Sequence, residues 1–312
     1  MSPGARRPAA RPLDDSLVED LVDAGSREHY LDAALYDYEY RRRRADVSFY
    51  RELARQRGAD RILELGAGTG RVTIPLARDG RQVVALDQSL PMLDRLRDRI
   101  ARLPPAAAAR ITPVAGDLRT FTLHARGPTG GKFPLAIAAF NVLEHLYTRG
   151  ELHACLQRVA AALAPGGAFA FDVQLPDLAW LLRDPSKRWA RTRFTDPTTG
   201  RVMYYSTNHD YDPVSQIALI RLYYEAADEP APARRPASRS RAHGAARLVR
   251  VVKLSQRKFF PAELEALVAG AGFRVVARYG DFSFGPLEGT AESQVLVCEP
   301  WAPARRKSPI SR

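Results

Sequence analysis

Cysteine and long apolar stretches are both scarce in this 312-residue chain. Its two cysteines, Cys155 and Cys298, are too few and too far apart for a disulfide framework or a zinc site, so we expect small core residues. No stretch approaches the roughly 18 uncharged apolar residues that a bilayer span needs. The N-terminus also lacks the apolar region of a signal peptide. We therefore expect a soluble, cytoplasmic protein with no metal site and no membrane partner.

The net charge of +12 suggests a nucleic-acid partner until the charges are located. Residues 1–12, 228–247 and 301–312 carry ten of the twelve net positive charges and are rich in Pro, Ala and Ser. Such segments bury little apolar surface, so we predict disordered tails at 1–12 and 301–312 and a flexible loop at 228–247. The remainder is near neutral, which argues against a basic face that follows phosphates.

Short apolar runs alternate with amphipathic stretches between residues 60 and 175, a pattern typical of β-α units around a parallel sheet. We predict five strands, at residues 61–65, 82–86, 111–115, 135–140 and 168–173. Two later runs, at 273–277 and 294–298, have no helix between them and are predicted to form a closing antiparallel pair. The fold class is therefore α/β, with a mostly parallel sheet.

Two segments lie outside this alternation. Residues 13–58 are predicted to form a helical cap before the first strand, with Asp46 as the cap of its last helix. Residues 200–258 are predicted to form a β-insertion that contains the flexible loop. The α/β core then consists of residues 59–199 and 259–300.

The sequence ELGAGTGR at residues 64–71 follows the first predicted strand and opens a helix. Glycines at such a turn allow a ligand to approach the main chain closely. Asp87 ends the second strand, 21 positions after Gly66, where a carboxylate can accept both hydroxyls of a ribose. A dinucleotide fingerprint requires a third small residue at the position of Arg71, which disfavours a bound pyrophosphate. These features indicate a different nucleoside-containing ligand.

The order and spacing of these motifs resemble those of the class I S-adenosylmethionine-dependent methyltransferases. The matches are residues 62–70, Asp87, residues 116–118, residues 140–146 and residues 163–167. The resemblance implies a Rossmann-like seven-stranded methyltransferase fold with an antiparallel closing strand and a β-insertion lid, as in small-molecule members. It also implies S-adenosyl-L-methionine as the cofactor.

The resemblance carries the family's cofactor contacts onto positions that match its motifs. They are Glu64, Gly66, Ala67, Gly68 and Gly70 at the methionine portion, Asp87 at the ribose, Gln88 and Met92 beside the nucleoside, Asp117 and Leu118 at the adenine, and Asn141 with His145 at the methyl group. His145 is the candidate general base, and a structural, hydrogen-bonded histidine is the alternative. For Asp117 the alternative is a turn-forming residue after Gly116.

Ten of the twelve tyrosines lie in the predicted cap and insertion. Aromatic faces attract cations, and both a sulfonium and a protonated amine are cations, so we take Tyr36 and Tyr40 as substrate-binding candidates. Tyrosine also suits half-buried strands and helix faces. His209 is a further candidate, although turn chemistry before Pro213 also explains it.

Three functions remain open at this point. The leading one is methyl transfer to nitrogen or oxygen of a small molecule, by a monomer or homodimer. The second is methylation of nucleic acid, which the basic charge favours. Against it, residues 140–143 lack the Pro-Pro-aromatic run that would resemble the enzymes that methylate the adenine amino group. Pro also precedes neither cysteine, as it would in a chain that resembled the cytosine-C5 methyltransferases. The third is a catalytically silent module that binds a nucleoside.

Overall fold

A computed structural model describes residues 15–123, 131–227 and 247–301 of the chain. The predicted tails and the predicted loop at 228–247 lie outside these ranges, except for Arg247 and Trp301. None of the helices in the described ranges is long and apolar enough to span a membrane. The described residues also contain no cluster of three or more His, Cys, Asp or Glu side chains that could hold a metal.

The core is a seven-stranded sheet with the order β10-β11-β5-β4-β1-β2-β3. The bounds are β1 Arg61–Leu65, β2 Gln82–Asp87, β3 Ile111–Ala115, β4 Phe133–Ala138, β5 Leu163–Gln174, β10 Phe273–Tyr279 and β11 Ser293–Pro300. The first five strands are parallel, and β11 runs antiparallel to both β5 and β10. The predicted fold class and closing pair are therefore confirmed. The strand order reverses between β1 and β4, where open α/β sheets bind ligands.

Alternating side chains bury both faces of this sheet. One face, which includes Leu63 and Leu65, packs on α7 (Arg149–Ala162) and α9 (Pro261–Gly270). The other face, which includes Ile62, packs on α3 (Ala45–Gln56) and α4 (Thr73–Arg78). Short α6 (Pro105–Ala108) precedes β3. Cys155 and Cys298 are free and buried, as predicted for core residues.

A second sheet is antiparallel, with the order β6-β7-β8-β9. Its strands are β6 Trp189–Thr195, β7 Val202–Asp212, β8 Ile217–Ala226 and β9 Arg247–Arg257, and short α8 (Leu178–Leu181) precedes them. The sheet therefore begins before residue 200, where the sequence placed the start of the insertion. Most side chains of β6 are exposed and several are charged or polar, so this stretch has no apolar pattern that would predict a strand.

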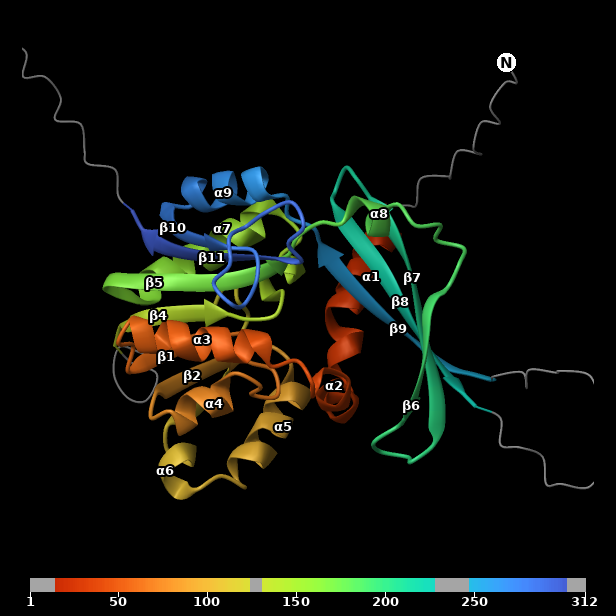
Figure 1. Ribbon diagram of the computed structural model, residues 1–312, viewed down its shortest axis with the longest axis horizontal. Coiled ribbons are helices and arrows are strands. Elements are labelled where there is room, and N and C mark those ends of the chain that lie inside the picture. The colour runs from red at the N-terminus through yellow and green to blue at the C-terminus, as the bar shows by residue number, and fades with distance from the viewer. Residues whose placement is uncertain (1–14, 124–130, 228–246, 302–312) are drawn as a thin grey trace, which may run out of the picture.

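The N-terminal helices lie between the two sheets (Figure 1). They are α1 (Asp15–Arg27), the short 3-10 helix η1 (Glu28–Tyr30) and α2 (Ala33–Tyr40). Helix α1 contacts β9, and α2 contacts α5 (Leu90–Ile100), which follows β2. These helices thus cover the edge of the core sheet at which β1, β2 and β4 end.

Candidate functional site

The glycine turn after β1 has three left-handed residues, each with a different reason to be glycine. Gly66 has φ +66°, and a Cβ there would lie 2.4 Å from Cγ2 of Val142. Gly70 has φ +83°, and its Cβ would lie 2.4 Å from a methyl carbon of Leu96. Gly68 has φ +56°, and its Cβ would meet only the methyl of Met92, at 3.4 Å. Because both Gly68 and Met92 line a cavity, a side chain at 68 would enter space available to a ligand.

Asp87 lies at the end of β2, directly beside this turn. Its Oδ2 accepts a hydrogen bond of 2.7 Å from the Gly68 amide, and its Oδ1 accepts one of 2.8 Å from the Ser89 amide. Burial raises the pKa of this carboxyl, which is only 9% exposed. These two hydrogen bonds from backbone amides leave free lone pairs on both carboxylate oxygens. The carboxylate can therefore accept further hydrogen bonds from a pair of hydroxyls.

Two small cavities lie over the turn. One of about 80 Å³ is lined by Ser26, Tyr30, Tyr36, Gly66, Gly68, Asp87, Gln88, Met92, Leu118, Ala139, Phe140, Val142 and His145. The other, of about 20 Å³, is lined by Tyr36, Glu64, Gly66, Ala67, Gly68, Thr69, Arg71, Val72, Ala139 and Phe140. Both fall below the roughly 300 Å³ at which organic ligands are usually held. Tyr36, Gly66 and Gly68 border both cavities, so the two lie side by side over the turn.

The structure thus brings together most of the residues singled out from the sequence. Asn141 follows β4 beside Phe140 but does not line either cavity. Gly70 and Tyr40 also lie outside the two linings, and the Tyr40 ring packs on Phe140 with centroids 4.8 Å apart.

Two candidate residues point to other partners. Asp117 forms a salt bridge of 2.6 Å with Arg119 and accepts the Arg119 amide, so the turn-forming alternative describes its contacts. Leu118, not Asp117, lines the larger cavity. His209 is only 3% exposed and stacks on Trp180 with ring centroids 3.8 Å apart. It lies on β7 of the second sheet and lines neither of the two cavities.

The backbone after β4 has two consecutive non-glycine residues in the left-handed region, Phe140 at φ 72° and Asn141 at φ 61°. Buried Asp172 on β5 accepts both of their amides, at 2.8 and 3.2 Å. The Tyr50 hydroxyl donates to the same carboxylate at 2.7 Å. Such strain persists only where the surroundings hold it, and it is concentrated at functional sites. Here it directs the chain into the 3-10 helix η2 (Val142–His145).

His145 ends η2 beneath the cap. Its Nε2 lies 2.6 Å from the Tyr30 hydroxyl, and its Nδ1 lies 3.3 Å from the Tyr147 hydroxyl. Burial lowers the pKa of His145 to about 4. The imidazole is therefore neutral near pH 7 and has a lone pair with which it can accept a proton.

Glu64 lies at the other end of the site, on β1. Its Oε2 accepts a hydrogen bond of 2.6 Å from the Thr73 hydroxyl, and burial raises the pKa of the carboxyl to about 8. A cation placed in the smaller cavity, which Glu64 lines, would favour the ionised form.

Two carboxylates from the predicted cap segment, Asp37 and Asp46, contact the glycine turn, and the sequence alone predicted neither contact. Asp37 of α2 accepts a hydrogen bond from the Thr69 hydroxyl at 2.6 Å and pairs with Arg95 at 2.8 Å. Asp46 does not cap α3, as the sequence suggested, but forms a bidentate pair with Arg71 at 2.7 Å. Asp46 is fully buried, so a charged partner matters more to it than an exposed helix terminus.

A buried ion pair joins the insertion to η2, the 3-10 helix that carries His145. Lys258 directly follows β9, and its Nζ lies 2.7 Å from Oε2 of Glu144 in η2. The other Glu144 oxygen accepts the Gln174 amide at 2.8 Å. Both charged side chains are at most 1% exposed. The pair therefore connects the second sheet to the residue that precedes His145.

Comparisons with known proteins bear on this geometry. Residues 62–167 match the family described as "Methyltransferase domain". The CcbJ methyltransferase of Streptomyces caelestis has a TM-score of 0.64 at 25% identity over 82% of this chain and 95% of that one. The chain belongs to the class I S-adenosylmethionine-dependent methyltransferases.

Two further relatives extend this assignment. CalS10, described as an amino pentose methyltransferase from Micromonospora echinaspora, shares the fold of this methyltransferase with a TM-score of 0.55, 21% identity and coverage of 93% and 98%. The ribosomal RNA small subunit methyltransferase A of Bifidobacterium longum is 25% identical over 74% of this chain and 77% of its own. Several other curated relatives align over only 22 to 42% of their own length.

Methyltransferases of this class use S-adenosyl-L-methionine, and the CalS10 structure is described with it bound. The residues of this methyltransferase fit such a group. The open side of Gly68 faces a cavity, the Asp87 carboxylate retains acceptor capacity, and Glu64 is a buried acid at the opposite end.

Proposed function

We propose that this methyltransferase transfers the methyl group of S-adenosylmethionine to nitrogen or oxygen of a small molecule. The observation that carries the proposal is that the cap covers part of the site. Tyr30 and Tyr36 from the cap line the same cavity as Gly68, Asp87 and His145. A site partly covered by a cap in this way admits a small acceptor more readily than a folded polymer. The description of CalS10 as an amino pentose methyltransferase also supports a small acceptor.

We assign roles to the residues that border the two cavities. Asp87 accepts the ribose hydroxyls, Gly68 gives the cofactor room, and Glu64 binds its ammonium group. When bound, S-adenosylmethionine supplies a methyl group on a sulfonium, which is already a good leaving group. The protein therefore has to hold the acceptor in line and exclude water, and such positioning is worth roughly 7 to 11 kcal/mol.

His145 is the proposed general base. Its neutral imidazole is hydrogen-bonded to Tyr30, so it can take a proton from an acceptor hydroxyl or ammonium that replaces this contact. Tyr147 contacts the other ring nitrogen and orients the imidazole.

Ribosomal RNA is a second candidate acceptor, because the Bifidobacterium longum relative aligns over most of this chain. The two candidates are separated by one assay. Purified protein is incubated with S-adenosylmethionine and either amine, phenol and carboxylate compounds or unmodified ribosomal RNA, and release of S-adenosylhomocysteine is measured. We expect turnover only with compounds from the small-molecule panel. Turnover with RNA alone would replace the proposal by the second candidate.

Tyr36 is expected to retain the bound cofactor, because its ring borders both cavities. In Tyr36→Ala, we expect radiolabelled S-adenosylmethionine to dissociate about tenfold faster in a chase experiment, since an aromatic contact with the sulfonium is lost. Tyr38→Ala is the matched control, because Tyr38 lies on the same helix but packs on Phe194 of the insertion. Equal dissociation rates in both variants would show that the Tyr36 ring does not cover the cofactor.

A further inference from the structure

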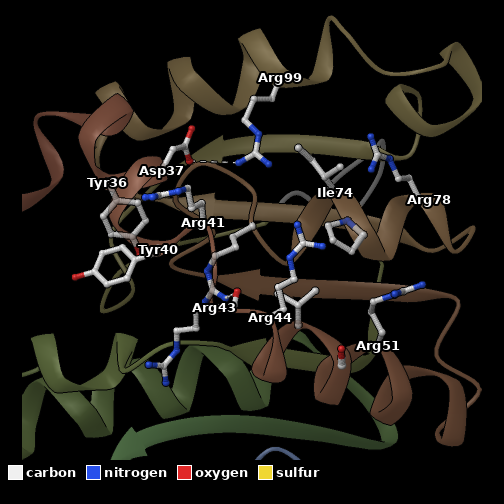
Figure 2. A pocket seen from close by; sticks show the side chains of 14 residues that line it. Tyr36, Asp37, Tyr40, Arg41, Arg43, Arg44, Arg51, Ile74, Arg78 and Arg99 are labelled. Carbon is white, nitrogen blue, oxygen red and sulfur yellow. Dashed lines mark hydrogen bonds and ion pairs between the residues drawn. The ribbon is translucent and has the colours of Figure 1, made fainter. Parts of the chain in front are cut away.

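A hollow of about 680 Å³ lies beside the cap, between α3, α4 and the segment that joins α2 to α3. We call it the arginine hollow, because seven arginines line it: Arg41, Arg43, Arg44, Arg51, Arg71, Arg78 and Arg99. Apart from Arg71, these side chains are labelled in Figure 2, which shows that they come from several different elements. Only one acidic residue, Asp37, is among the lining residues.

The acids near the hollow are already paired. Both oxygens of Asp46 bind Arg71, and both oxygens of Asp79 bind Arg51 at 2.6 Å. Asp37 is shared between two arginines of α5 and the Thr69 hydroxyl. These three carboxylates are therefore already paired with Arg51, Arg71 and the arginines of α5.

Arg44 and Arg78 have no acidic partner within 4.0 Å among the described residues, although they line the same hollow. Arg44 precedes α3, and Arg78 ends α4. Guanidinium groups that line one hollow without carboxylate partners make its potential positive, and a bound anion lowers this electrostatic energy. Their planar forks match the oxygens of a phosphate.

The lining of the hollow also includes the apolar residues Val47, Ile74 and Pro75. Figure 2 shows the ring of Tyr40 at one side. The volume of the hollow lies within the roughly 300 to 1,000 Å³ typical of sites for organic ligands. A ligand with both anionic and apolar parts would therefore use the whole lining. A nucleic-acid backbone would instead be matched by an extended basic track, whereas these arginines surround a concavity.

We propose that the arginine hollow binds a phosphorylated small molecule with at least two negative charges. This site is separate from the Asp87 carboxylate, and it does not depend on the identity of the methyl acceptor. Tyr36 and Arg71 border both the hollow and the smaller cavity over the glycine turn. Occupancy of the hollow therefore affects the two residues that lie at the methionine end of the cofactor site.

The test is calorimetric titration of the whole protein with inorganic pyrophosphate and with uridine diphosphate, at fixed ionic strength. We expect each compound to bind at one saturable site. Uridine diphosphate should bind more tightly than pyrophosphate, because its nucleoside also covers the apolar part of the hollow. The double variant Arg44→Ala/Arg78→Ala should weaken both by at least about tenfold, since two charge-assisted contacts are lost. Both side chains are exposed, so the fold should be retained.

The matched control is Arg149→Ala/Arg158→Ala, which removes the same charge from exposed positions on α7. It should bind both probes as the unmodified protein does. Equal weakening in the two double variants would indicate a general charge effect and overturn the proposal, as would the absence of binding. A duplex RNA oligonucleotide that binds through Arg44 and Arg78 while pyrophosphate does not would assign the hollow to nucleic acid instead.

Discussion

Asp87→Ala should weaken the binding of S-adenosylmethionine by about 100-fold or more. The carboxylate is placed to accept two ribose hydroxyls, and each hydrogen bond to a charged group is worth ~1.5 to 3 kcal/mol. The substitution also removes the acceptor of the Gly68 amide, which lies 2.7 Å from Oδ2. The substitution therefore removes a hydrogen bond that holds the glycine turn as well as the acceptor for the ribose hydroxyls. Calorimetric titration with the cofactor measures the loss.

Two variants separate these effects from a general loss of charge or fold. Asp94→Ala removes a carboxylate that is exposed on α5 and pairs with Arg97, so its affinity for the cofactor should be unchanged. Asp87→Asn keeps the shape of the side chain and should bind with intermediate affinity. If Asp87→Ala binds as tightly as the unmodified protein, the ribose assignment is wrong.

His145→Ala should lower kcat by about 100-fold while the affinity for S-adenosylmethionine stays the same. The reason is that a proton must leave the acceptor during or after methyl transfer, and His145 is the neutral base beneath the cap. His153→Ala is the matched control, because this histidine is exposed on α7. If His145→Ala lowers only the melting temperature, with normal turnover, the histidine has a structural role.

The pH dependence of the reaction provides a second readout. A general base is inactive when protonated, so kcat/KM for a hydroxyl acceptor should fall as the pH decreases through about 4, the pKa of His145. A histidine in water would produce this decrease near pH 6.5. The low value arises because burial disfavours the imidazolium. A decrease centred near 6.5 would therefore contradict the buried, neutral state of His145.

The sequence was informative wherever one element determines the structure. Apolar runs located the strands of the core sheet, including the closing antiparallel pair. Glycine spacing also brought Gly66 and Gly68 to the cavity that contains Asp87 and His145. These signals depend on local backbone requirements, which a single sequence displays directly.

Contacts between distant elements could not be predicted in this way. Asp46 precedes its partner Arg71 by 25 residues, and nothing in the local pattern distinguishes a buried pair from a helix cap. Asp172 supports the strained backbone of Phe140 and Asn141 from the neighbouring strand. Strand β6 was missed because an exposed edge strand requires little apolar surface, and the stacking of His209 on Trp180 has no local signal in the sequence.

The ion pair between Lys258 and Glu144 has a consequence for protein engineering. Exchange of the second sheet between related enzymes would separate the two partners of this pair, because Lys258 follows β9 and Glu144 lies in η2. A transplanted sheet without a lysine at 258 would leave the Glu144 carboxylate buried without its counterion, a situation that commonly costs about 3 to 5 kcal/mol. That cost would fall on the loop that carries His145. Chimeras should therefore take both ends of this pair from the same parent.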